Sequence, residues 1–348
     1  MLFQHLDTVA PALNSDQARV ALILETVQVE THVKDTGLSG GRPFYSMKPS
    51  ARAFLVKSLL NLPTTKDLIA RLNVDDRLRT LCGFIHGKVP SQSTFSRHFA
   101  HLSKEVVVDE VHESLVIRHV GKEIVHHLSR DSSAIEGREK PQAKVKKERP
   151  PKKKMGRPPK GAEPVYKEPS RIDAQLTQDY KTSLSQLPRG CAVGSKTNSK
   201  GHVSHWIGFK LHLDVADDGL PISAFTTSAS VHDSQVAIPL ARMTNDRVGG
   251  VFYETMDKAY DAEGIRQAVR ELGHVPIIQP ADRGGRKAVP LDEAQANRFK
   301  TRTTVERTFA DLKDNHGGRF VRVRTPAKVH THLMFGVLAI FALTVLKI

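Results

Sequence analysis

The stretch GFKLHLDVADDGLPISAFTTS, residues 208–228, decides the fold class of this chain. From Phe209 to Val215 apolar residues alternate with polar ones, which is the pattern of a strand that buries one face. An Asp-Asp-Gly turn follows, after which residues 220–228 can pair back. The stretch therefore predicts an antiparallel hairpin within a sheet.

The segments on either side extend this hairpin into a larger sheet. Upstream, β-branched residues and alternation from Ile124 predict a strand that delivers Asp131 near its end. Downstream, helix and strand patterns alternate, and one strand ends at Asp257. The ranges expected there are helix 236–242, strand 249–256, helix 262–272, strand 275–278, a long helix at about 297–315 and an apolar C-terminal helix. A meander followed by such alternation predicts a mixed α/β sheet with flanking helices.

The first 120 residues have a different, mostly helical pattern. Leucine and isoleucine recur at helical spacing within residues 55–72, and the Pro-Thr-Thr at 63–65 ends one helix and caps the next. Ser91 or Ser93 can cap a further short helix that carries Arg97. Short capped helices with a basic last member resemble a helix-turn-helix arrangement, so Arg97 is a candidate DNA contact. The alternative is an ordinary helical bundle with a solvated polar face.

The composition points to a polyanionic partner. The 348 residues carry 52 Lys and Arg against 37 Asp and Glu, a formal net charge of +15, which favours nucleic acid or an anionic membrane. A membrane is the weaker interpretation, because the apolar run at residues 333–346 is too short for a bilayer and no signal-peptide pattern is present. Cys82 and Cys191 form no paired motif, which disfavours zinc and fits a reducing compartment. We expect a cytoplasmic protein that binds a polyanion.

A basic segment interrupts the expected sheet. Residues 138–171 hold thirteen Lys and Arg against four Glu, many prolines and few large apolar side chains, so they cannot form a packed core. We expect a disordered insertion at about 138–200, with order resuming at His205. A Gly-Arg-Pro core flanked by lysines resembles an AT-hook, which inserts arginine into the minor groove, although a basic linker that binds phosphates without preference is the alternative. The candidate DNA contacts in this segment are Lys152, Lys153, Lys154, Arg157 and Lys160.

The late helix carries a possible functional stripe. Arg302, Glu306, Phe309 and Lys313 fall within roughly 60° of one helical face at about 100° per residue. Cations on such a face can grip phosphates while the acid binds a metal. The simpler alternative is an exposed Arg–Glu pair that stabilises the helix by a few tenths of a kcal/mol.

Two aspartates strengthen the functional interpretation. Asp131 and Asp257 each close a predicted strand, where active-site residues are commonly placed. Two strand-end aspartates together with Glu306 supply the hard oxygen ligands that Mg²⁺ prefers. Such a cluster can hold two cations for phosphoryl transfer, one that activates the nucleophile and one that stabilises the leaving oxygen. The spacing alone is weak evidence, because aspartate pairs also arise by coincidence.

Five runs carry a further resemblance: SRDSSAIEGREKP, GFKLHLDVADDGLPISAFTTSASVHDS, MDKAYDAEG, RTTVERTFADLK and HLMFGVLAIFAL. They resemble bacterial insertion-sequence transposases of the DDE type, in particular the branch with a Tyr-x2-Arg-x3-Glu-x6-Lys signature. The resemblance covers nearly the whole chain. It implies a ribonuclease-H-like catalytic fold, the catalytic and metal-binding acids Asp131, Asp257 and Glu306, and phosphate contacts by Arg302 and Lys313.

The chain departs from this family pattern at two positions. Phe299 stands where the signature has Tyr, and Ala259 replaces the usual Gly near Asp257. Neither residue is an expected metal ligand, so we expect an intact site. Asp261 is expected to cap the next helix. The run His232-Asp233-Ser234 is expected to be a loop in which Asp233 or Ser234 caps a helix, because sequence neighbours cannot converge as a hydrolase triad.

The combined expectation is a helical, DNA-binding region at residues 1–120 and a ribonuclease-H-like catalytic domain at 121–348. The resemblance implies a transposase that binds terminal inverted repeats and target DNA, uses two Mg²⁺ ions (which Mn²⁺ can replace), and pairs the two element ends as a homodimer. The alternatives are a nuclease of the same fold that does not join strands, and a non-enzymatic DNA-binding regulator.

Overall fold

A computed structural model of the chain describes residues 14–34, 45–84, 87–143, 169–197, 201–282, 287–319 and 321–347. Most of the basic segment lies outside these residues. The expected AT-hook and its five cations, Lys152, Lys153, Lys154, Arg157 and Lys160, therefore stay sequence-based predictions.

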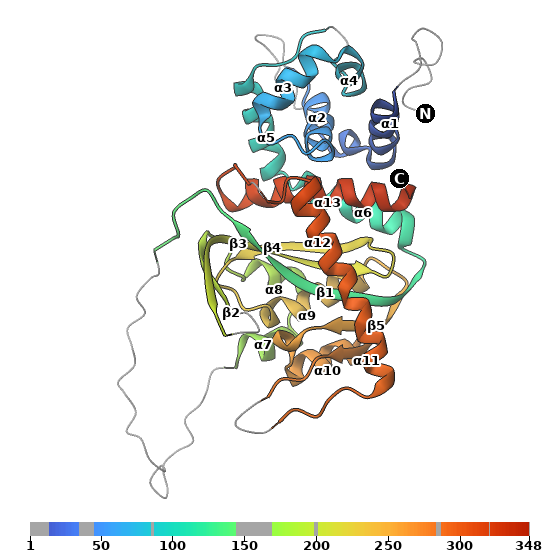
Figure 1. The fold of residues 1–348 in the computed structure, drawn as a ribbon, viewed down its shortest axis with the longest axis vertical. Coiled ribbons are helices and arrows are strands. Elements are labelled where there is room, and N and C mark those ends of the chain that lie inside the picture. The colour runs from blue at the N-terminus through green and yellow to red at the C-terminus, as the bar shows by residue number, and fades with distance from the viewer. Residues whose placement is uncertain are drawn as a thin grey trace, which may run out of the picture.

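The N-terminal region is helical, as its sequence predicts, and forms one end of the molecule (Figure 1). The Thr64 and Asp67 side chains cap each other's backbone N–H groups at the start of one helix, and Ser91 caps another. The elements are α1 (Ser15–Val27), η1 (Val29–His32), α2 (Lys48–Leu59), α3 (Thr65–Val74), α4 (Asp76–Leu81), α5 (Gln92–Lys104) and α6 (Val107–Val120).

A six-stranded mixed sheet forms the other end of the molecule. Its central strand, β1, pairs antiparallel with β3 and parallel with β5, and β5 pairs parallel with β6. On the far edge of β3, β2 pairs with the first half of the strand and β4 with the second half. The strands are β1 (Ile124–Glu136), β2 (Ala192–Thr197), β3 (Val203–Ala216), β4 (Pro221–Ser228), β5 (Gly250–Met256) and β6 (Val275–Ile278). This confirms the predicted α/β class with a mixed sheet.

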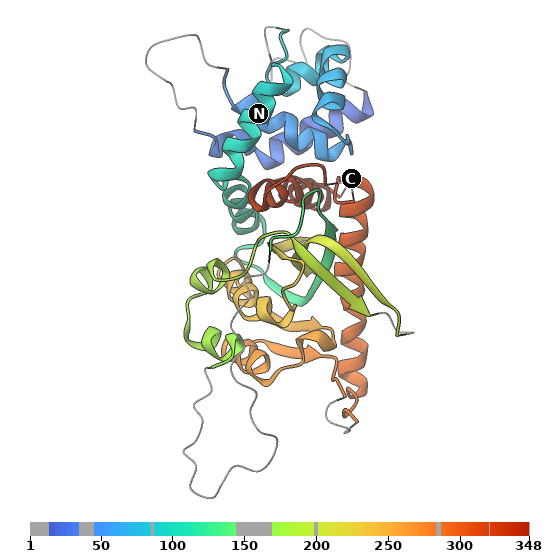
Figure 2. The same cartoon turned by 90° about the vertical axis from the view of Figure 1, so that its left-hand side faces the viewer.

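Helices cover both faces of this sheet (Figure 2). On one side, α9 packs against β3 and β4, and α10 packs against β6. On the other side, α12 crosses β1 and β3. These helices and the short turns beside them are α7 (Arg171–Thr177), α8 (Tyr180–Ser185), α9 (Ser234–Asn245), η2 (Lys258–Tyr260), α10 (Glu263–Glu271), α11 (Glu293–Phe299), η3 (Lys300–Arg302) and α12 (Thr303–Asn315).

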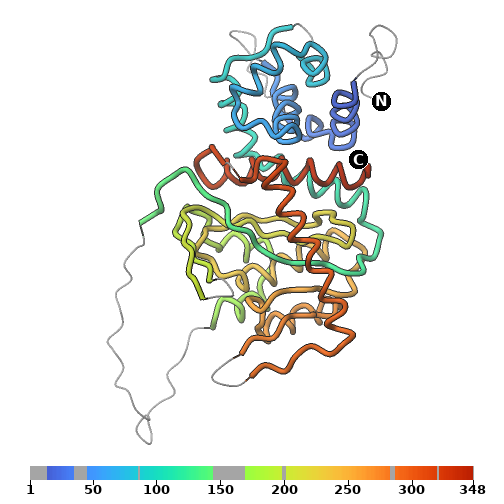
Figure 3. Tube along the Cα trace, viewed as in Figure 1, coloured from blue at the N-terminus to red at the C-terminus, as the bar shows by residue number. Residues whose placement is uncertain are grey.

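The last helix, α13 (Pro326–Leu346), lies between the N-terminal helices and the sheet, alongside α6 (Figure 3). It contacts α1, α2, α5 and α6 on one side and β4 and α12 on the other. By length and composition it could cross a membrane, but 83% of its most apolar window is buried inside the protein. One continuous apolar core therefore includes this helix, the N-terminal helices and part of the sheet.

Three sequence-based expectations need correction. Asp131 is not near a strand end, because β1 continues to Glu136 and stays paired with β3 throughout. The expected disorder does not extend through 169–197, where α7, α8 and β2 form, and β3 already begins at Val203. Tertiary hydrogen bonds from α9 explain this order: Arg242 donates to three carbonyl groups at the C-terminal end of α7 and just beyond it.

The predicted late helix is also divided. The range of about 297–315 comprises the end of α11, the 3₁₀ turn η3 and α12, so Arg302 precedes α12 instead of lying within it. The backbone of Arg302 is still close to helical, with φ −56° and ψ −23°. Arg302 and Glu306 consequently keep their helical relationship despite the change of helix type.

Candidate active site

The parallel pairing of β1 and β5 brings two of the predicted acids together. Arg130 of β1 is paired with Met256 of β5, and the two strands run in the same direction. The residues that follow them, Asp131 and Asp257, therefore lie side by side. Asp257 directly follows β5, as its sequence predicts, and its Oδ1 accepts the Ala259 N–H at 2.8 Å. This bond fixes the Asp257 carboxylate at the start of η2.

The Asp131 carboxyl is largely buried, and its side chain is 20% exposed. Burial is the main cause that raises its pKa to about 6, and the negative charge of Asp257 adds to the rise. A 2.7 Å hydrogen bond from the Ser132 N–H and the positive charge of Arg302 act in the opposite direction. The site thus holds negative charge in a poorly solvated position, where a bound cation is favoured.

Arg302 connects the third acid to this pair. Its Nη1 lies 2.9 Å from Asp131 Oδ2, and its Nη2 donates to Glu306 Oε1. The preceding turn is held against β1 by Ser129, whose hydroxyl donates to the Thr301 carbonyl at 3.1 Å. Glu306, on α12, is thus linked to Asp131 by the Arg302 guanidinium. The Glu306 side chain itself is 50% exposed.

The donor set has the chemistry that a hard divalent cation requires, since all three predicted ligands are carboxylates. Asp131 and Asp257 are neighbours, and the interaction between their charges is unfavourable unless a cation offsets it. Within the described ranges, however, no three Asp, Glu, His or Cys side chains are close enough to form a metal site. Instead, the Arg302 guanidinium pairs with both Asp131 and Glu306.

The other predicted DNA contacts lie apart from the acids. Lys313 is seven residues beyond Glu306 on α12, about 10 Å along the axis. Burial lowers its pKa, and the nearby charges of Arg319 and Lys196 lower it further, which places it beside the β2–β3 hairpin. Arg97 is exposed on α5 and donates to the Thr94 hydroxyl at 3.3 Å.

A second polar cluster beside Asp131 was not foreseen from the sequence. Asp233 Oδ1 accepts from the Ser132 hydroxyl and from Lys210 Nζ, each at 2.8 Å. The negative charge of Asp233 also raises the pKa of Asp131. Asp233 does occupy the N-cap position of α9, but its side chain makes no capping hydrogen bond, so the predicted capping role is wrong for this residue. The available signal was Lys210, a charged residue within a largely buried strand.

The expected cap at Asp261 is also wrong. The N-cap position of α10 is Ala262, and Asp261 instead pairs with Arg266 Nη2 at 2.7 Å. Its other oxygen accepts the Ala281 N–H at 3.0 Å. Phe299, where the family signature has Tyr, lies 5.8 Å from the Arg302 guanidinium and forms an apolar neighbour for it.

A buried ion network supports the strand that carries Asp131. Arg130, on the opposite face of β1, donates twice to Asp214 at 2.7 Å and once to Glu254 at 2.8 Å. Glu254 also lies 2.7 Å from His274 Nδ1, and Asp214 accepts from Thr244 at 2.6 Å. The network connects β1 to both neighbouring strands. It therefore holds the register that sets Asp131 beside Asp257.

Two family matches agree with this geometry. Residues 172–342 match the family described as transposase DDE domain, and residues 6–101 match the transposase domain family DUF772. The chain belongs to the DDE transposases. Searches of curated proteins and of solved structures returned no match.

The DDE family match of this transposase includes only two of the three predicted catalytic acids. Asp257 and Glu306 lie inside the DDE match, whereas Asp131 precedes its first residue by more than forty positions. The role of Asp131 therefore depends on geometry, namely its position beside Asp257 and its ion pair with Arg302.

Proposed function

We propose that this transposase cleaves DNA at the terminal inverted repeats of its own element and joins the freed ends to target DNA. The observation that carries the proposal is the convergence of strand-borne Asp131 and Asp257 with Glu306 of α12 through Arg302. We assign the chain to the branch with the Tyr-Arg-Glu-Lys signature, with Phe299 in the place of Tyr.

Asp131, Asp257 and Glu306 would hold two Mg²⁺ ions, which Mn²⁺ can replace. Bound there, the ions would activate a water or a 3′-hydroxyl and stabilise the leaving oxygen. The hydrogen bonds from the Ser132 and Ala259 N–H groups keep the two aspartates oriented before any ligand arrives. The buried network below β1 prevents the strands from shifting register during the reaction.

Arg302 has two tasks in this proposal. Without metal, it neutralises Asp131 and Glu306 and reduces the repulsion between the acids. When cations take over that neutralisation, the planar guanidinium can turn its five donors to a phosphate beside the scissile bond. Lys313 would contact the same DNA further along α12. Arg97 and the linker cations would bind the backbone outside the active site.

The protein would act in the bacterial cytoplasm, at the nucleoid, and in two copies. Pairing of two element ends requires one active site for each end, which is the reason for proposing a homodimer. Symmetric pairs are also the commonest oligomers among soluble proteins.

Joined products test this function. The full chain is incubated in Mg²⁺ with a labelled duplex that carries the DNA flanking its coding sequence, together with a supercoiled target plasmid. We expect cleaved ends and sequenced junctions between the ends and the plasmid. Cleavage without junctions would replace the proposal with a nuclease, and DNA binding without either product would replace it with a regulator.

A further inference from the structure

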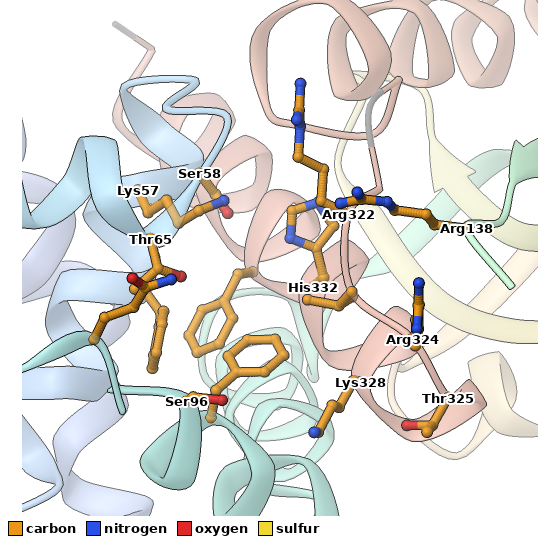
Figure 4. Close-up of a pocket in the computed structure, with 15 residues that line it drawn as sticks. Lys57, Ser58, Thr65, Ser96, Arg138, Arg322, Arg324, Thr325, Lys328 and His332 are labelled. Carbon is orange, nitrogen blue, oxygen red and sulfur yellow. The ribbon is translucent and has the colours of Figure 1, made fainter. Parts of the chain in front are cut away.

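A cavity of about 440 Å³ opens between the N-terminal helices and the start of α13 (Figure 4). Its volume lies in the range of about 300–1,000 Å³ that is usual for ligand pockets. Side chains of α2 and α5 form one side, and the segment that connects α12 to α13 forms the other. The cavity is therefore built at the joint between the two parts of the molecule, away from Asp131 and Asp257.

The charge of this cavity has one sign. Five cationic side chains line it, whereas no Asp or Glu does. Within the described part of the chain, none of the five has a carboxylate at ion-pair distance. The nearby acids are engaged elsewhere, since Glu139 accepts the Thr325 N–H at 3.2 Å and Asp67 caps α3. The five cations are Lys57, Arg138, Arg322, Arg324 and Lys328.

Lys57 holds its amino group in a buried position close to a second cation, Arg322. Burial is the main cause that lowers its pKa to about 8, and the charge of Arg322 lowers it further, while Asp67 raises it. The neighbouring His332 has its pKa lowered to about 4 by burial and by Lys57. An anion in the cavity would relieve this accumulation of positive charge.

The remaining walls fit a nucleotide unit of a DNA strand. Phe54, Phe99 and Phe335 pack together at the base, with ring centroids 4.9 Å apart for Phe54 and Phe99. Ser96 and Thr65 add hydroxyl groups on the rim. Proteins that bind nucleic-acid strands combine cations, which contact the phosphate oxygens, with an apolar surface, which contacts the sugar or base.

We propose that this cavity binds phosphate groups of the DNA strand that leads away from the active site. The inference rests on the proposed function, because it takes the bound DNA to be the substrate. Arg138 lies seven residues beyond Asp131 along the line of β1, at most about 23 Å at 3.3 Å per residue. At about 3.4 Å per nucleotide, the contact falls within roughly seven nucleotides of the scissile phosphate.

The salt dependence of binding tests the pocket. The variant is the full chain with Arg322→Ala and Arg324→Ala, two exposed positions where truncation spares the core. The matched control carries Lys122→Ala, at the opposite end of β1 from Arg138, and Lys181→Ala on α8. Fluorescence anisotropy with a 40-base-pair duplex of arbitrary sequence gives the slope of log affinity against log salt.

Each lost phosphate contact removes about 0.9 from this slope, so the variant should lose about 1.8. Between 50 and 200 mM salt, the wild type should then lose about twelvefold more affinity than the variant. The control should behave as the wild type does. An equal slope in variant and wild type, with thermal midpoints showing that both are folded, would overturn the inference.

Two further experiments decide whether the bound phosphate belongs to DNA or to a free nucleotide, and where along the DNA it lies. If deoxyadenosine monophosphate raises the thermal midpoint of the wild type only, while the DNA slopes are equal, the cavity serves free nucleotides and the DNA assignment is wrong. In a cleavable end, neutral methylphosphonates are placed one at a time up to about seven nucleotides from the cut, and at least one of them should weaken binding of the wild type but not of the variant. The binding assay does not depend on cleavage. If the variant shows the smaller salt slope but the wild type cleaves no DNA, only the proposed function is contradicted.

Discussion

Arg302 holds two carboxylates at once, and this sets its role apart from that of an ordinary surface arginine. Asp131 and Glu306 belong to different elements, and the guanidinium is the described group that joins them. An exposed pair such as Arg302 with Glu306 alone would stabilise the fold by less than about 1 kcal/mol. The pairing with partly buried Asp131 ties the residue to the site itself.

Replacing Arg302 with Ala should therefore affect cleavage far more than folding. We expect cleavage in Mg²⁺ to fall by about a hundredfold, the scale seen when one positioned donor at a reacting group is lost. The thermal midpoint should change little. Rates and midpoints are measured on the same preparations, with Arg307→Ala, exposed on α12, as the control. Near-normal cleavage by the Arg302 variant would show that the arginine only stabilises the helix.

Single residues also show how far sequence patterns reach. Asp257 could be placed at a strand end because the strand pattern and its end are both local features. The Asp233–Lys210–Ser132 cluster could not, because those residues meet only when β1, β3 and the loop before α9 come together. Helix capping at Asp233 was predicted from local preference, and the tertiary contact with Lys210 prevailed.

At the scale of elements, β1 determines the site because it pairs with strands of both directions. Its register with β5 aligns the two aspartates, and its register with β3 extends the strand past Asp131. Arg130 links all three strands through Asp214 and Glu254, and each of these side chains is at most 1% exposed. A strand shift of one residue would move Asp131 to the opposite face.

Removing the charge of Arg130 should thus be costly. Arg130→Met leaves two carboxylates buried without their partner, and we expect a loss of about 3–5 kcal/mol in the free energy of unfolding. Urea unfolding measures the loss, with Lys140→Met, at an exposed position, as the control. Combining Arg130→Met with Asp214→Leu and Glu254→Met should recover much of the stability. A loss below about 1 kcal/mol in the single variant would mean that the network does not hold the strands.

The elements differ in how well the sequence predicts them. β6 and the hairpin of β3 and β4 follow clear local patterns and turn residues, so their positions were predictable. The helices α7 and α8 are short and follow a basic segment, and they depend on contacts with α9 that no local pattern reveals. The division between η3 and α12 has no breaking residue to announce it.

At the scale of the whole molecule, α13 joins the two parts through buried polar contacts as well as apolar ones. His332 on this helix lies 3.0 Å from the Gly317 carbonyl, and His330 lies 2.8 Å from Asp109 of α6. His112 of α6 is fully buried and lies 2.9 Å from the Pro221 carbonyl at the start of β4. Buried histidines consequently form polar contacts where the N-terminal helices and α13 pack against the sheet.

These buried histidines predict acid sensitivity. Burial lowers the pKa of His112 to about 3, and of His212 and His332 to about 4, whereas an unfolded histidine has a pKa of about 6.5. The unfolded chain therefore binds more protons below pH 6.5, so their contribution to stability is complete above that pH and is lost as the pH falls towards 4. Burial raises the pKa of Asp131 and of Asp214, and these two acids oppose the trend.

Urea unfolding between pH 7.5 and 4.5 measures this loss. The free energy of unfolding should fall steadily below about pH 6.5, and His112→Gln should reduce the slope. A stability that is independent of pH across this window would show that the histidines are not held neutral in the folded protein.

The central claim is that Asp131, Asp257 and Glu306 form one metal-dependent catalytic site, and cleavage by three single variants tests it most directly. Asp131→Asn, Asp257→Asn and Glu306→Gln are assayed in Mg²⁺ on the end duplex, with Glu293→Gln, exposed on α11, as the control. Each amide is a poor ligand for a hard dication, so all three variants should lose cleavage while still binding DNA, and the control should cleave normally. Near-normal cleavage by any one of the three would contradict the claim.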